Sequence, residues 1–143
     1  MTTELAAASI LDLKWHELAD IPEDITTREQ ATAFIDSFEA TIAEKIGLNP
    51  EITFRYRTTY FNHIFSSGYN TGYYGYLWSE VLDKDAFSIF EASPNGPFDL
   101  ELAKKFKETF LEKGGSEEPM ILYKSFAGRE PDSQAFLKGR GLL

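Results

Sequence analysis

Residues 59–90 read TYFNHIFSSGYNTGYYGYLWSEVLDKDAFSIF, a densely aromatic stretch that indicates the fold class of the chain. The Ser66-Ser67-Gly68 sequence is expected to break this stretch in two. From about Asn70 to Phe90 we expect one helix, with Trp78 and Leu82 among the side chains available for packing. A long helix in the middle of the sequence favours an α-helical fold.

The sequence before this stretch reads as two further helices separated by short breaks. Residues 3–19 place apolar side chains at i, i+4 and i+7, and Ile21-Pro22 ends that segment. Thr27 to Gln30 is a capping-box pattern, and the helix that it starts is expected to run to Gly47. The apolar faces of these helices are candidates for the core or for an interface with a missing partner: Leu11, Trp15 and Leu18, and Ala31, Phe34, Ile35 and Phe38.

The remaining segments also favour helices. Residues 51–56 alternate enough for a short strand, and an extended loop fits them equally well. Asp99 and Ser116 are the expected caps of two helices, which close at Gly114-Gly115 and at Gly128. Asp132 is expected to cap a last helical turn. The predicted fold class is all-α, in a single helical unit over residues 1–143.

Composition excludes several classes of function. The 143 residues include no cysteine, which excludes disulfide scaffolds, thiolate metal sites and cysteine nucleophiles. The formal charge of −9, without clustered Lys or Arg, argues against nucleic acid as a partner. No apolar stretch reaches the roughly 20 residues of a membrane-spanning helix, and the first residues do not resemble a secretory signal. We therefore expect no membrane partner and a cytoplasmic location.

Metal chemistry has few candidate ligands in this sequence. The two histidines, His16 and His63, form neither a HExxH motif nor a pair at i, i+4. A catalytic zinc site would need both histidines and a carboxylate to meet in the folded chain. We therefore expect no metal ligand in this chain.

Three tyrosines give the aromatic stretch a candidate chemistry. Tyr69, Tyr73 and Tyr76 follow each other at i, i+4 and i+7, so the predicted helix would carry three phenol groups on one face. A tyrosine hydroxyl is a neutral donor at pH 7, suited to stabilising an oxyanion or to holding a carboxylate. His63 lies just before the predicted break, where its imidazole could face the same space. The alternative is structural, because tyrosines at helical spacing commonly pack in a core or an interface.

Glycines and arginines near these tyrosines have the same two interpretations. Gly68 and Gly72 leave room for the close approach of a ligand or of another helix. Arg55 and Arg57 are candidates for binding a peptide carboxylate or for local packing. On these residues alone, the stretch is a candidate binding face without an assigned ligand.

Residues 56–80, YRTTYFNHIFSSGYNTGYYGYLWSE, resemble the C-terminal part of the thimet oligopeptidase and peptidyl-dipeptidase family of zinc metallopeptidases. The resemblance continues through VLDKDAF at 81–87 and resumes at GGSE (114–117) and FAGREP (126–131). The opening LAAASILD, at 5–12, is also similar to a segment of that family. The resemblance therefore covers nearly the whole chain.

The resemblance implies a large, mostly helical enzyme whose two halves enclose a deep channel. In that family, zinc is held by the two histidines of HExxH and a downstream glutamate, and the glutamate of the motif is the general base. This sequence lacks these residues. The resemblance thus implies zinc in the parent enzyme and no cofactor in this chain.

The resemblance also gives roles to individual residues. It implies that His63 and Tyr76 donate hydrogen bonds to the scissile carbonyl oxygen and to the tetrahedral intermediate. Tyr69 would hold the substrate backbone or help to stabilise the transition state, and Tyr73 matches a further tyrosine that lines the channel.

Gly68 and Gly72 match a flexible glycine-rich stretch ahead of the helix in that family. The family often has two or three glycines where Ser66-Ser67 precede Gly68 here. The run at 56–65, YRTTYFNHIF, is closer to bacterial peptidyl-dipeptidases than to endo-acting oligopeptidases.

The expected function is therefore that of a C-terminal substrate-binding and oxyanion-stabilising portion of a zinc metallopeptidase that hydrolyses oligopeptides. Alone, the chain is expected to be inactive. Its expected partners are short peptides as substrate, together with the missing zinc-bearing portion or a second copy bound through exposed apolar faces. One alternative is a stand-alone peptide-binding or interaction module without catalysis. Another is an unrelated helical structural protein whose tyrosines are core residues.

Overall fold

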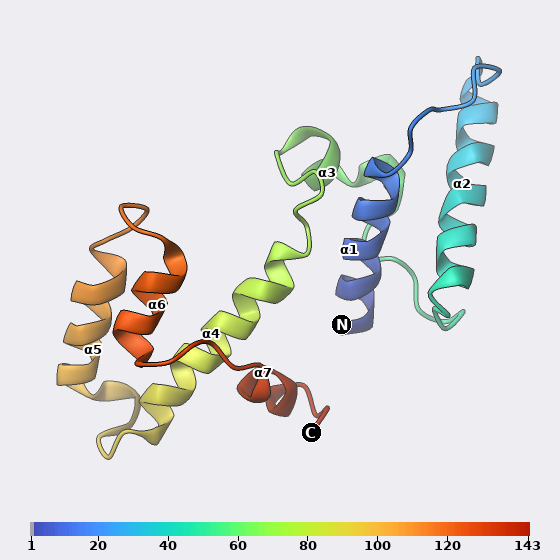
Figure 1. Ribbon diagram of the computed structural model, residues 1–143. Helices are drawn as coiled ribbons and strands as arrows, with labels where there is room; N and C mark the ends of the chain where they lie inside the picture. The colour runs from blue at the N-terminus through green and yellow to red at the C-terminus, as the bar shows by residue number, and fades with distance from the viewer. Residues whose placement is uncertain (1) are drawn as a thin grey trace. The chain divides into compact units, whose positions relative to one another are not determined.

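The computed structural model describes residues 2–143 and confirms the all-α prediction, since these residues form helices and no strand (Figure 1). The helices are α1 (Thr2–His16), α2 (Arg28–Lys45), α3 (Asn62–Ser66), α4 (Gly75–Ala92), α5 (Leu100–Phe106), α6 (Pro119–Ala127) and α7 (Gln134–Gly139). Three shorter segments are η1 (Thr58–Tyr60), η2 (Gly96–Phe98) and the π-helical η3 (Lys107–Leu111). No helix of residues 2–143 combines the length and the apolar character needed to cross a bilayer.

The chain divides into two compact units, Met1–Leu77 and Trp78–Leu143. The prediction of a single helical unit over residues 1–143 stays a prediction.

In the first unit, α1 packs against α2. The predicted capping box at the start of α2 is present, with the Thr27 hydroxyl accepting the Gln30 amide and the Gln30 side chain accepting the Thr27 amide. Leu11 is fully buried, and the rings of Trp15 and Phe38 lie 4.1 Å apart. The apolar faces of both helices thus meet in a core, which is one of the two predicted alternatives.

A second apolar cluster of this unit consists of Ala8, Phe61, Ile64 and Tyr73. The first cluster consists of Ala7, Leu11, Ile42 and Phe54. Ala7 and Ala8 are neighbours on α1, so this helix contributes to both clusters. Residues 51–56 form turns and loop, and the extended-loop alternative is therefore the correct one.

The predicted start of the long helix at Asn70 is wrong, because α4 begins only at Gly75. Residues 70–74 form turns, and Thr71 has a positive φ of 59° that an α-helix does not allow. The amides of Thr71 and Tyr73 bond to the side chain of Asp12 on α1 instead of taking helical partners. A contact with a residue far away in the sequence thus replaces a local helix.

The second unit contains most of α4 together with α5, α6 and α7. The ring of Phe126 on α6 lies 4.9 Å from that of Phe106 on α5 and 5.9 Å from that of Phe90 on α4. Asp99 caps α5 as predicted, by accepting the Leu102 amide at 3.0 Å. α6 ends as predicted at Gly128, which adopts a left-handed φ of 74°.

Two helices of this unit start at other residues than the sequence predicts. Ser116 does not cap α6, which begins at Pro119 after Glu118. Proline is favoured at the first position of a helix because its ring already fixes a helical φ. Asp132 precedes the N-cap residue of α7, Ser133, and still accepts the Gln134 amide at 2.9 Å.

Within the second unit, Asp85 on α4 binds α6 and the residues that follow it. Its carboxylate is buried and accepts hydrogen bonds from the Tyr123 hydroxyl, from both terminal nitrogens of Arg129 at 2.7 Å, and from the Asp132 amide at 3.1 Å. Burial alone would raise the pKa of Asp85, and the hydrogen bonds from Arg129 and Tyr123 outweigh it, so the pKa lies below its usual value.

Candidate functional site

The histidine and the three tyrosines predicted as site residues lie together in the first unit. We call His63, Tyr69, Tyr73 and Tyr76 the tyrosine cluster. The rings of Tyr69 and Tyr76 stack with centroids 5.3 Å apart and planes 11° apart. The His63 ring lies edge-on to the three tyrosine rings, at 6.0 Å from Tyr69, 5.5 Å from Tyr73 and 6.2 Å from Tyr76.

The cluster is not the face of one helix that the spacing predicts. His63 belongs to α3, Tyr69 to the loop after α3, Tyr73 to the turns before α4, and only Tyr76 to α4 itself. The loop and the turns therefore bring together side chains that come from separate segments.

The tyrosines of the cluster differ in their exposure. Tyr69 and Tyr76 are each 40% exposed, whereas Tyr73 is only 2% exposed and packs edge-on to Phe61 at 4.9 Å. Tyr73 is thus the buried member of the cluster and part of the core, and its predicted contact with substrate stays a prediction. The surface of the cluster consists of Tyr69 and Tyr76, with His63 half-buried beside them.

Two phenols of the cluster, those of Tyr73 and Tyr76, have raised pKa values. The pKa of Tyr76 is raised to about 12. The largest cause is hydrogen bonding with the Tyr69 side chain, and partial desolvation is the second. Burial is the main reason why the pKa of Tyr73 is also raised. At neutral pH both side chains therefore carry their proton, which is the state in which a phenol can donate a hydrogen bond.

The two predicted glycines have different roles in the backbone. Gly68 has a φ of 78°, a conformation that side chains with a Cβ rarely adopt, and next to it the Tyr69 amide donates to the His63 carbonyl at 3.0 Å. An added Cβ on Gly72 would lie 3.5 Å from the Tyr69 carbonyl oxygen, which is ordinary contact. Gly68 therefore shapes the turn that joins Tyr69 to His63, and Gly72 is not required by local space.

The chain just before the cluster is held by the two N-terminal helices. The Trp15 indole donates to the Thr58 hydroxyl at 2.8 Å, and the Thr58 amide donates to Glu39 at 2.6 Å. Arg57 donates to Glu39 and, at 2.7 Å, to Asp36. These contacts fix the backbone a few residues ahead of His63.

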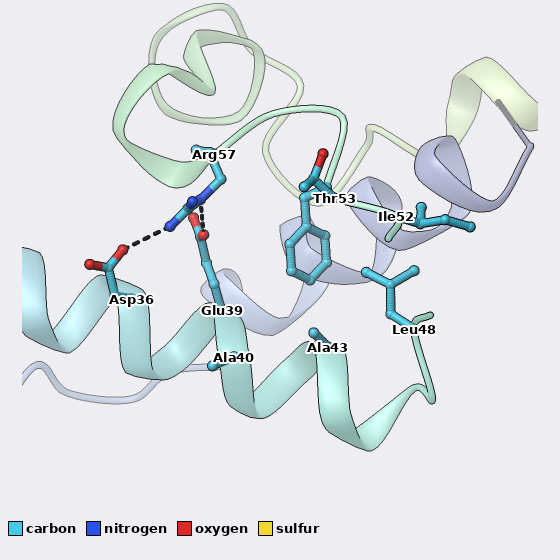
Figure 2. Close-up of a pocket in the computed structure, with 9 residues that line it drawn as sticks. Asp36, Glu39, Ala40, Ala43, Leu48, Ile52, Thr53 and Arg57 are labelled. Atoms are coloured by element: carbon cyan, nitrogen blue, oxygen red, sulfur yellow. Dashed lines mark hydrogen bonds and ion pairs between the residues drawn. The ribbon is translucent and has the colours of Figure 1, made fainter. Parts of the chain in front are cut away.

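A surface hollow of about 220 Å³ lies beside these contacts, between α2 and residues 48–57 (Figure 2). Phe54 and Leu48 line it, and its charged side chains are paired, since Arg57 binds both Asp36 and Glu39. Arg57 thus takes part in local packing, one of its two predicted roles. Arg55 lies beside Tyr56, with its guanidinium 6.0 Å from the ring centre.

The described residues do not fit a zinc site. No group of three His, Asp or Glu side chains within residues 2–143 is placed to hold a metal ion. His16 Nδ1 lies 2.9 Å from the Asp12 carboxylate, and His63 is surrounded by aromatic rings.

Sequence reasoning missed one residue that contacts the site, Asp12. Its carboxylate is fully buried and binds the turns that carry Tyr73. A pattern in the sequence could have indicated it, because Ala8, Leu11, Asp12 and Trp15 fall at i, i+3, i+4 and i+7. A charged residue on such an apolar face of a helix needs buried partners.

Comparisons with known proteins identify sequences that are similar to this chain. The sequence profile of peptidase family M3 matches residues 1–142. Dipeptidyl carboxypeptidase of Escherichia coli is 37% identical over 142 residues, which cover 98% of this chain and 19% of that protein. Oligopeptidase A of Haemophilus influenzae is 51% identical over 83 residues (58% of this chain and 12% of that protein), and saccharolysin of Saccharomyces cerevisiae is 39% identical over 82 residues (57% and 11%). The chain thus spans about a fifth or less of the length of these relatives.

Proposed function

This chain belongs to peptidase family M3, and we propose that it is the substrate-binding and oxyanion-stabilising portion of a zinc metallopeptidase that hydrolyses oligopeptides. The observation that carries the proposal is the meeting of His63, Tyr69 and Tyr76 in one partly exposed cluster. These side chains come from separate segments, and a purely structural role would not need two of the phenols to remain exposed.

The cluster has the chemistry that a peptidase needs opposite its nucleophile. Attack on a peptide carbonyl places negative charge on the carbonyl oxygen, and neutral donors stabilise that oxyanion. The Tyr76 phenol, with its pKa raised to about 12, keeps its proton at neutral pH. Its hydroxyl can therefore donate to an oxyanion, which is a stronger acceptor than a neutral oxygen. His63 is the second proposed donor.

The part of the parent enzyme that holds zinc is proposed to lie outside this chain. The sequence lacks HExxH, and the described residues do not fit a zinc site. We therefore expect the isolated chain to bind short peptides weakly and to leave them intact. If the isolated chain hydrolysed peptides, the proposal that the zinc-bearing portion lies outside this chain would be wrong.

The test is a chimera in which this chain replaces the matching 19% of Escherichia coli dipeptidyl carboxypeptidase. Removing one oxyanion donor typically lowers kcat by about 10² to 10³-fold, so we expect losses of this size in Tyr76→Phe and in His63→Ala. Tyr74→Phe is the matched control, because Tyr74 is 53% exposed and lies outside the cluster. Its turnover should equal that of the unchanged chimera.

An active chimera whose Tyr76→Phe variant turns over at the unchanged rate would refute the assignment. Thermal unfolding of each variant, followed by circular dichroism, separates loss of chemistry from loss of folding.

Release of C-terminal dipeptides is the activity that we propose for the parent enzyme. Dipeptidyl carboxypeptidases are matched over 98% of this chain, and oligopeptidase A of Haemophilus influenzae over 58%. Mass spectrometry of the products, with this chain grafted into both kinds of relative, tests the proposal. Internal cleavage by both chimeras would contradict it. The cytoplasmic location stays a proposal as well.

A further inference from the structure

The turns that carry the tyrosine cluster are bound by one carboxylate of α1. Asp12 Oδ1 accepts the amide of Thr71 and Asp12 Oδ2 accepts the amide of Tyr73, both at 2.9 Å. The side chain of Asp12 is fully buried. A single acidic group from the start of the sequence thus holds two backbone amides that lie 59 and 61 residues further along.

We propose that Asp12 is a positioning residue for the tyrosine cluster, an inference that rests on the proposed function. Thr71 lies between Tyr69 and Tyr73 and keeps a left-handed φ of 59°, which a residue with a Cβ adopts only when its surroundings enforce it. The two hydrogen bonds to Asp12 enforce it here. They also keep these amides from extending α4 backwards.

This arrangement decides where the phenols lie. With the turns in place, Tyr73 is buried against Phe61, and Tyr69 folds back to stack on Tyr76. A continuous helix that included residues 69–76 would place all three tyrosines on one face, and it could not bury one while stacking the other two. Asp12 thus selects the stacked pair of exposed phenols.

His16 lies beside Asp12, one turn along α1. Its Nδ1 donates to the Asp12 carbonyl oxygen at 2.8 Å and lies 2.9 Å from Asp12 Oδ1. The imidazole thus covers one side of a carboxylate whose two hydrogen bonds come from the amides of Thr71 and Tyr73.

The first test is amide hydrogen exchange in the full chain, which needs no activity. In Asp12→Asn we expect the amides of Thr71 and Tyr73 to exchange about tenfold faster or more, because the substituted side chain loses one of its two acceptor oxygens. Amides in the middle of α2 should keep their rates. The matched control is Asp24→Asn, an exposed aspartate of the same unit, which should change neither set.

Two outcomes of this test would overturn the proposal: unchanged exchange at Thr71 and Tyr73, or equal acceleration across α1, α2 and the turns. The second outcome would mean that Asp12 supports only the general stability of the unit.

The second test uses the active chimera and a double-mutant cycle. A misplaced donor costs up to about a hundredfold in rate, so Asp12→Asn should lower kcat by about 10 to 100-fold with little change in KM. Once Tyr76→Phe has removed the donor, Asp12→Asn should cost much less, because the two changes affect the same interaction. Independent, multiplying losses would overturn the positioning role.

The two proposals fail in distinguishable ways. An active chimera in which Tyr76→Phe has no effect refutes the proposed function and, with it, positioning for catalysis. A full effect of Tyr76→Phe together with unchanged exchange in Asp12→Asn refutes the role of Asp12 alone.

Discussion

Gly68 and Gly72 flank Tyr69 and differ in backbone conformation. Gly68 has a φ of 78°, whereas Gly72 lies outside the left-handed region. The carbonyl of His63 accepts the Tyr69 amide just after Gly68, so the left-handed residue closes the turn that brings histidine and tyrosine together. The geometry of the cluster therefore depends on the absence of a Cβ at one glycine and not at the other.

Gly68→Ala is expected to lower the free energy of unfolding by about 1–2 kcal/mol, the cost of forcing a residue with a Cβ into the left-handed region. Gly72→Ala, the matched control, should leave it unchanged within about 0.5 kcal/mol, because the added Cβ meets only ordinary contacts. Urea unfolding of the two variants measures both values. Equal losses would show that the φ of Gly68 does not carry this cost.

At the scale of elements, local sequence patterns predicted a helix start correctly where the two residues that hydrogen-bond at that start are close in sequence. The capping box from Thr27 to Gln30 and the Asp99 cap are confirmed because each involves only three or four residues. The predicted start of α4 is wrong because the observed start depends on Asp12, a residue about 60 positions away. The predicted start of α6 is wrong for a local reason, since Pro119 indicates the first position of the helix more strongly than Ser116 indicates a cap.

In the candidate site, too, the features that depend on residues far apart in the sequence could not be predicted. Its residues could be named from the resemblance of residues 56–80, and the structure brings all four together. The burial of Tyr73 could not be predicted, because the rings that cover it, Phe61 and Tyr56, reach it only through the turns before α4.

The contact between α4 and the end of α6 should depend on pH through Asp85. Because the pKa of Asp85 is lowered by folding, its contribution to stability is complete above its unfolded pKa and is lost as the pH falls through its folded value. We therefore expect the second unit to lose stability below about pH 4, from the usual pKa of an aspartate.

Asp85→Asn should remove that part of the pH dependence. At pH 7 it should cost about 1–3 kcal/mol, as expected when buried hydrogen-bond partners lose their charged acceptor and the half-exposed Arg129 regains water. Thermal unfolding between pH 2 and 7 measures both effects. Asp83→Asn, on the exposed face of the same helix, should retain the pH dependence of the unchanged chain.

At the scale of the whole molecule, the chain carries apolar side chains that its own units leave uncovered. In the second unit Phe98 is 87% exposed, Leu100 is 81% exposed and Leu111 is 60% exposed. Large exposed apolar surface commonly marks an interface. Since the chain spans about a fifth of the length of its relatives, the proposed cover in the parent enzyme is the zinc-bearing portion.

Without that portion, we expect the isolated chain to associate with itself in a concentration-dependent way. Burying one large apolar side chain contributes about 1.5–3 kcal/mol, which corresponds to a tenfold change in affinity or more. The double variant Phe98→Ser, Leu100→Ser should therefore raise the dissociation constant by at least about tenfold. Light scattering across a dilution series measures it. Ile21→Ser, which removes a 62% exposed side chain from the first unit, is the control and should leave the constant unchanged. A chain that stays monomeric at every concentration would contradict the expectation, because these side chains would then remain in water without a partner.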